Sequence, residues 1–102
     1  MTREHLLTTL RAMEPELRAA GVVGLSVFGS VGRGDNGEKS DVDLAVQLGE
    51  QFSARGLEYF SSLERLERRF AERLGCAVEV LEEPVRTARL QSEIDRDRAV
   101  AF

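Results

Sequence analysis

An alternation of residue types between positions 41 and 48 constrains the fold of this chain more than any other feature. The even positions are Val, Leu, Val and Leu, whereas the odd positions are Asp, Asp, Ala and Gln. A period of two is typical of a strand with one face on a core and the other toward solvent. Side chains two residues apart leave a strand on the same face, with their Cα atoms about 6.5 Å apart. We therefore expect Asp41 and Asp43 to share the open face of a sheet.

A glycine–serine pair follows the preceding apolar run. Residues 22–28 are apolar on both faces, which is typical of a strand inside a covered sheet, and Gly29 and Ser30 come next. Glycine lets a backbone approach a phosphate, because it adopts positive φ and has no side chain in the way. Ser30 offers a hydroxyl, Arg33 a fixed charge, and a short helix after Ser30 would favour an anion. The alternatives are a serine-capped turn, and an Arg33 that is solvated or paired within its loop.

The two aspartates suit a divalent magnesium ion. Magnesium is a hard cation that is usually shared between one or two carboxylates and the phosphates of a substrate. Two such ions, about 3.5–4 Å apart, can be straddled by carboxylates on neighbouring positions of one face. The alternative is that both aspartates are ordinary residues on the solvent-exposed face of a sheet. The turn at Gly29 and Ser30 argues against this alternative. The glycine–serine turn and the two aspartates together predict a site that binds a nucleotide and a metal ion.

The rest of the chain predicts helices around a small sheet. A helix over residues 2–13 has Thr2 as its N-cap, and a short second segment stops at Gly21. Apolar residues at intervals of three and four predict a long amphipathic helix from 57 to 74, with the whole apolar stripe in the core. Residues 76–81 alternate again, with Glu79 opposite Val78 and Val80. Loops are expected at 34–39 and 49–56. A last short helix around 90–94 precedes an apolar tail, whose Val100 and Phe102 are candidates for part of a surface that contacts a partner.

Length and composition limit the function classes. The 102 residues form one domain, 1–102, with no room for a separate acceptor-binding domain. The net charge of −4 and the dispersed basic residues argue against direct binding of nucleic acid. No apolar run has the length of a membrane span, no secretion signal is visible, and the single Cys76 suits a reducing cytoplasm.

The motif resembles that of a known family. Gly29-Ser30, ten residues and then Asp41-Val42-Asp43 are similar to the signature of the minimal nucleotidyltransferases, a branch of the DNA polymerase β-like nucleotidyltransferase superfamily. The resemblance implies an α/β fold, a small mixed sheet flanked by helices. It also implies that Gly29, Ser30 and Arg33 bind the nucleotide and that Asp41 and Asp43 are catalytic metal ligands. The family usually has a third aspartate, whose place in this chain is taken by Glu79.

The resemblance also implies an activity and a partner. Family members of this size resemble the antitoxins of two-component systems, which bind a helical HEPN-type ribonuclease toxin and transfer AMP from ATP to its tyrosine with two magnesium ions. One alternative is a non-catalytic module that binds a nucleotide or a partner and neutralises its partner by contact. Another is a nucleotidyltransferase of the aminoglycoside-modifying type, which the short chain disfavours. A homo-oligomer is compatible with all three.

Overall fold

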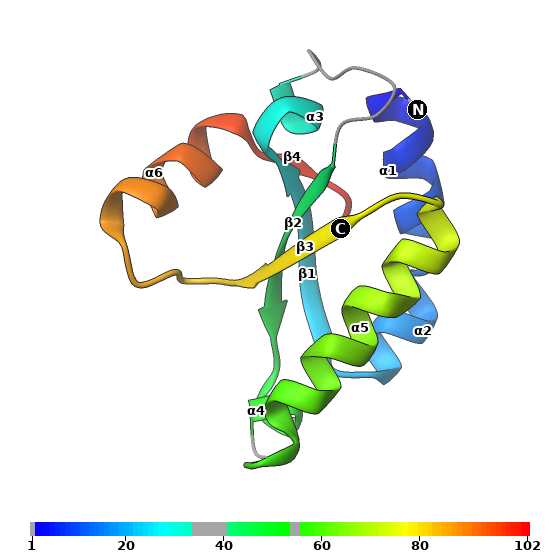
Figure 1. Ribbon diagram of the computed structural model, residues 1–102, viewed down its shortest axis with the longest axis vertical. Coiled ribbons are helices and arrows are strands. Elements are labelled where there is room, and N and C mark those ends of the chain that lie inside the picture. Colours follow the sequence, from blue (N-terminus) through cyan, green and yellow to red (C-terminus); the bar gives the residue numbers. More distant parts are fainter. Residues whose placement is uncertain (1, 34–40, 54–55) are drawn as a thin grey trace.

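The computed structural model describes residues 2–33, 41–53 and 56–102, and Figure 1 shows the elements that they form. In chain order these are α1 (Arg3–Ala12), α2 (Glu14–Ala19), β1 (Val22–Phe28), α3 (Gly29–Arg33), β2 (Val42–Leu48), α4 (Glu50–Ser53), α5 (Glu58–Leu74), β3 (Val78–Glu82), α6 (Ala88–Asp97) and β4 (Ala99–Val100).

The helix ends follow local chemistry. Thr2 caps α1, because its hydroxyl accepts the backbone N–H of His5 at 3.1 Å, as predicted. Pro15 stands in the first turn of α2, where its missing N–H costs nothing. Gly75 ends α5 with a φ of 69°, and its N–H donates to the carbonyl of Ala71. Within the described ranges, no helix combines the length and the apolar character needed to cross a membrane.

The four strands form one mixed sheet in the order β3-β2-β1-β4. Strand β1 runs antiparallel to both β2 and β4, whereas β2 and β3 are parallel and are connected through α4 and α5. Strand β2 is therefore paired on both of its edges. This arrangement confirms the small mixed sheet flanked by helices.

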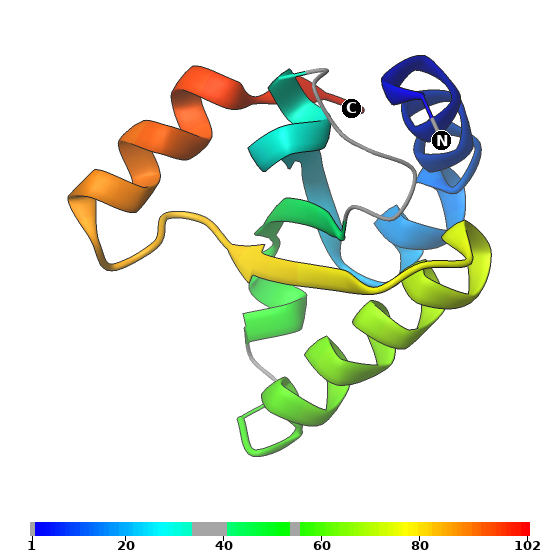
Figure 2. The same cartoon turned by 45° about the horizontal axis from the view of Figure 1, so that its top comes forward.

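The two faces of the sheet are covered by different helices, as the views in Figures 1 and 2 agree. Helices α1, α2 and α5 cover one face, where the main core contains residues such as Leu10, Val27, Leu44 and Phe70. Helix α6 covers part of the other face, through a smaller cluster around Phe28, Ala45 and Ile94. Even and odd positions of β2 thus face different layers, as their alternation predicts.

Three expectations were incomplete or wrong. The predicted loop at 49–56 contains α4, which buries Phe52. The apolar stripe of α5 is core only in part: Leu57 is 98% exposed and Phe60 72% exposed, because the first turn of α5 extends beyond the end of the sheet. The apolar tail is in part built into the sheet, since β4 pairs with β1 and Ala101 is buried, whereas Val100 is 52% exposed. Its role as a surface for a partner stays a prediction.

Candidate active site

Three carboxylates converge at one end of the open face of the sheet. Asp43 on β2 and Glu79 on β3 are directly paired in the parallel register, and Asp41 lies two residues before Asp43. Neighbouring strands are about 4.8 Å apart, so Glu79 stands at the level of Asp43. Val42 and Val80, the neighbours of these acids along the strands, are buried in the main core, which turns the acids to the other face. The structure thus places the three carboxylates that the sequence singled out at neighbouring positions on one face of the sheet.

The electrostatics of this cluster are those of like charges held close together. Asp43 is half-buried, and burial raises its pKa; the negative charges of Glu79 and Asp41 raise the pKa further. Burial also raises the pKa of Cys76, and the negative charge of Asp41 raises it further. An oxygen-binding cation would neutralise this repulsion, which is the property expected of a magnesium site.

The donor set fits magnesium, although its side chains are not already gathered around one point. Among the described residues, no three His, Cys, Asp or Glu side chains are close enough together to hold one ion. Asp41 and Glu79 are exposed and Asp43 is half-buried, so the two exposed side chains are the freer to change rotamer. Holding one ion would require such a change.

Gly29 connects the two halves of the motif. It follows Phe28, which is paired with Asp43 across β1 and β2, and it has a φ of 67°. A Cβ atom at this position would lie 2.4 Å from Oδ2 of Asp43, well inside van der Waals contact. Only glycine therefore permits both this backbone conformation and the approach of the turn to the carboxylate. The turn and the acids form one structural unit.

Helix α3 begins directly at this turn, as predicted, and places the half-buried Ser30 in its first turn. Val31 anchors α3 in the main core. Gly32 has a packing role that the sequence did not reveal: its Cβ would lie 2.5 Å from the carbonyl oxygen of Asp97 in α6. The Gly32 carbonyl also accepts a hydrogen bond from Arg3 of α1 at 3.2 Å. Both helical layers therefore hold α3 in place.

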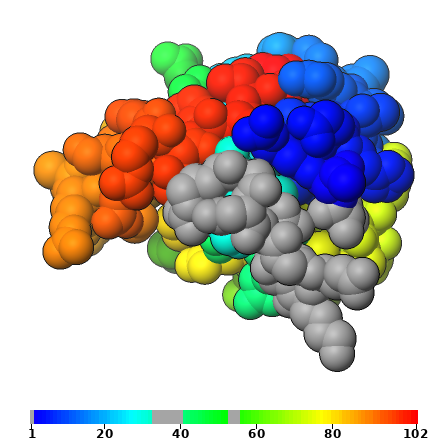
Figure 3. Space-filling view, turned by 90° about the horizontal axis from the view of Figure 1, so that it is seen from above, coloured from blue at the N-terminus to red at the C-terminus, as the bar shows by residue number. Residues whose placement is uncertain are grey.

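Part of the predicted site lies outside the described residues. Arg33 is the last residue of α3, but its side chain is not among those described, and neither is the loop at 34–40. The role of Arg33 therefore stays a prediction. In the view from above, α6 (orange to red) lies to the left and α1 (blue) to the right (Figure 3).

An ion-pair network holds α6 against the face that carries the acids, and sequence reasoning missed it. Arg98 donates to both carboxylate oxygens of Glu83, at 2.9 and 2.5 Å, and also to Ser26 and Asp95. The hydrogen bond with Glu83 is the main cause of a raised pKa for Arg98. Glu83 follows β3, Ser26 belongs to β1 and Asp95 to α6, so one guanidinium links three elements. Nothing in the local sequence pattern indicates such a long-range contact.

Comparison with known proteins agrees with this geometry. The family described as nucleotidyltransferase domain matches residues 6–98. A solved structure provisionally assigned as a minimal nucleotidyltransferase has 31% identity and a TM-score of 0.75, over 97% of this chain and 95% of that one. A crystal structure of a mutant of the toxin–antitoxin pair MntA-HpeT has 17% identity and a TM-score of 0.65, over 100% of this chain and 73% of that one, and its likeness concerns the fold alone. No curated protein sequence matches significantly.

The family match spans the turn at Gly29, both aspartates and Glu79. The solved relative extends the likeness over nearly the whole fold. The protein thus belongs to the nucleotidyltransferase domain family, in its minimal nucleotidyltransferase branch.

Proposed function

We propose that this protein transfers AMP from ATP to a hydroxyl group of a partner protein. The observation that carries the proposal is the unit made by the Gly29 turn, the adjoining Asp43 and the register-paired Glu79. It puts a backbone that is suited to phosphate next to carboxylates that are suited to magnesium. The reaction forms a bond between the acceptor oxygen and the α-phosphorus, breaks the bond to the β-phosphate, and releases pyrophosphate and the hydroxyl proton.

The residues divide this work among them. The Gly29 backbone and the Ser30 hydroxyl bind and orient the β- and γ-phosphates, while Asp41, Asp43 and Glu79 hold two magnesium ions. When bound, the ions neutralise the triphosphate and acidify the acceptor hydroxyl. Holding nucleotide and acceptor in line is itself a large part of such catalysis. Arg33 would add a positive charge on the phosphate side of the site.

The glutamate at position 79 should affect the rate of AMP transfer more than the affinity for ATP. It adds one methylene to the expected ligand, and magnesium demands near-octahedral geometry. Because Glu79 is exposed on the edge strand β3, its carboxylate has room to adjust. We therefore expect magnesium-dependent ATP binding to be robust, and the rate of transfer to depend on how Glu79 places its ion.

We further propose that the acceptor is a helical HEPN-type toxin encoded in the adjacent reading frame, and that the protein acts as its antitoxin. The fold likeness to the MntA-HpeT pair supports this assignment. The acceptor hydroxyl would belong to a tyrosine of that toxin. An Arg-x4-6-His motif in the neighbouring frame would identify it.

Labelled ATP provides the test. The candidate toxin is incubated with α-labelled ATP, magnesium and either the wild-type protein or Asp41→Asn with Asp43→Asn, and label incorporation and co-purification are followed together. Labelling by the wild type alone, with co-purification by both proteins, supports an enzymatic antitoxin. A tight complex without any labelling by the wild type rejects transfer, and favours a module that neutralises its partner by contact.

A further inference from the structure

Strand β3 lies at the edge of the sheet, and one of its two sides is unpaired. Within the described ranges, β2 is the only strand that pairs with it. Toward β2, the carbonyl of Ala77 accepts the N–H of Val42, and the N–H of Glu83 donates to the carbonyl of Val46. Successive residues of a strand direct their backbone groups to alternate edges. Val80, three positions from both Ala77 and Glu83, therefore turns its N–H away from β2.

Glu67 of α5 accepts this outward N–H. The nitrogen of Val80 lies 3.2 Å from Oε1 of Glu67, which is half-buried, and the Val80 side chain is 4% exposed. The N–H of Val80 and the carbonyl of Glu79 belong to one planar peptide group. The peptide that follows Glu79 is consequently fixed from the outer edge of the sheet by α5.

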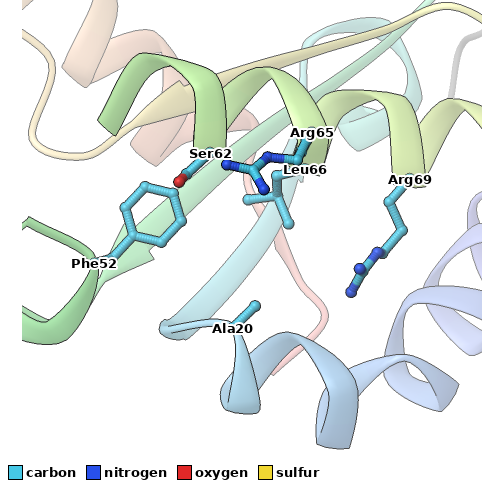
Figure 4. A pocket seen from close by; sticks show the side chains of 6 residues that line it. All are labelled: Ala20, Phe52, Ser62, Arg65, Leu66 and Arg69. Atoms are coloured by element: carbon cyan, nitrogen blue, oxygen red, sulfur yellow. The ribbon is translucent and has the colours of Figure 1, made fainter. Parts of the chain in front are cut away.

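The place of Glu67 on α5 commits its carboxylate to β3. Arg65 and Arg69 line a pocket together with Ala20 and Phe52, on the side of the helix toward α2 (Figure 4). Glu67 is two positions from each arginine, about 200° around the helix, so it faces the opposite side. Helical ion-pair partners stand three or four positions away. Those positions hold Leu63, Glu64, Phe70 and Ala71, none of which is basic.

Other contacts of α5 hold the same strand. Leu66 and Phe70 of α5 pack with Val80 in the main core. The hydroxyl of Tyr59 donates to the carboxylate of Glu82 at the far end of β3. Of these polar contacts, the one made by Glu67 is adjacent in sequence to Glu79 and reaches the backbone itself.

We propose that Glu67 is a positioning residue, which holds Glu79 where it can bind its magnesium ion beside Asp43. Glu67 contacts neither the ion nor the nucleotide and acts through the peptide group between Glu79 and Val80. Without it, this peptide is held from β2 alone, and a tilt of the backbone is passed on to the Glu79 carboxylate. Misplacement of a catalytic group by about 1 Å can cost on the order of 100-fold in rate. The inference rests on the proposed function in that Glu79 is a magnesium ligand.

Three variants of the full chain, labelled with ¹⁵N, test the role of Glu67. Glu67→Ala removes the acceptor, whereas Glu67→Gln keeps an amide oxygen that still accepts the Val80 N–H. Glu72→Ala, an exposed glutamate on the same helix, is the control for loss of charge. In the free protein, exchange of the Val80 N–H with solvent should become at least tenfold faster in Glu67→Ala and change less than twofold in the other two.

Magnesium binding and transfer are measured on the same variants. In a magnesium titration followed at the backbone N–H signal of Glu79, the half-saturating concentration should rise at least threefold in Glu67→Ala alone. With ATP and the candidate toxin, kcat should fall at least fivefold in this variant, while KM for ATP changes less than twofold. A merely structural contact would lower the melting temperature but leave both quantities unchanged at a temperature where every variant is folded.

Several results would overturn the proposal. Unchanged exchange at Val80 in Glu67→Ala would show that Glu67 does not hold this N–H. Faster exchange with an unchanged magnesium titration would reduce Glu67 to a stabilising contact, and an equal effect of Glu67→Gln would assign the effect to charge. A wild type whose Glu79 signal ignores magnesium would also reject it. If the wild type shows the expected titration but transfers no AMP, the proposed activity fails, whereas the role of Glu67 stands on the exchange and magnesium measurements.

Discussion

Replacing Gly29 with alanine should test the link between the phosphate turn and the acids. Two costs arise from this one methyl group. The first is the positive φ of 67°, which costs a non-glycine residue about 1–2 kcal/mol. The second is the approach of Cβ to 2.4 Å from Oδ2 of Asp43, which makes that carboxylate turn away at a further cost of about 0.5–1.5 kcal/mol. We therefore expect Gly29→Ala to lower the free energy of unfolding by about 1.5–3.5 kcal/mol.

Gly75 supplies a matched control within the same chain. Its φ of 69° is nearly the same, but an added Cβ would meet no atom within 4 Å. Gly75→Ala should consequently show the backbone cost alone, about 1–2 kcal/mol. The difference between the two variants in urea unfolding then measures the contact with Asp43. In an Asp43→Ala background this difference should disappear, because the clashing carboxylate is gone.

Nucleotide binding adds an independent measurement. If Asp43 holds magnesium, as proposed, a displaced carboxylate would hold it less well, so Gly29→Ala should weaken the affinity for magnesium–ATP at least tenfold in calorimetric titrations. Gly75→Ala should leave this affinity unchanged. Equal stability of the two variants, together with unchanged affinity in Gly29→Ala, would refute the assignment of Gly29 and Asp43 to one site.

Three further predictions concern charge. Asp43 has a raised pKa in the folded protein, which means that folding favours its protonated form. Its contribution to the free energy of unfolding is therefore complete below the ordinary pKa of 3.8 and is lost as the pH rises through the folded pKa. Without magnesium, Asp43→Asn should therefore melt above the wild type at pH 7, and the gain should vanish in acid; a lower melting temperature at pH 7 would contradict this. Arg98→Met should lower the free energy of unfolding by about 2–4 kcal/mol, because the nearly buried Glu83 loses its counter-charge, and urea unfolding that changes by less than 1 kcal/mol would disprove it. Asp41→Asn with Asp43→Asn should keep its circular dichroism spectrum but lose magnesium-dependent ATP binding, and binding equal to that of the wild type would exclude these ligands.

Periodicity and spacing predicted the parts of this protein that depend on local rules. The strand with Asp41 and Asp43, the short helix after Ser30 and the helix end at Gly75 all follow from patterns of a few residues. The pairing of Glu79 with Asp43 needed an assumption about strand neighbours, which the parallel register confirms. These features follow because alternation and capping act over distances that a sequence displays directly.

The remaining features depend on contacts between distant parts of the chain. Arg98 meets Ser26 across 72 positions, and no local signal announces such a pair. The helical stripe indicated that Phe60 belonged to the core, because periodicity shows which side of a helix is apolar but not where the sheet beneath it ends. The strand pairing of the apolar tail is a contact of the same kind, since only the fold shows that β4 adds to the edge of β1.

Strand β2 carries both the carboxylate that is destabilised by its neighbours' charges and the buried apolar residues that offset this repulsion. Asp43 stands among like charges at the cost that its raised pKa reflects. Its two neighbours, Val42 and Leu44, are at most 3% exposed, and each contributes about 1.5–3 kcal/mol by burial. Hydrogen bonding to strands on both edges holds the register while the carboxylates repel one another. Acidic and buried apolar residues alternate along this one strand, so the acidic charges can be removed by substitution without loss of the packing. In the wild type the repulsion between the carboxylates favours binding of a cation, which would neutralise it.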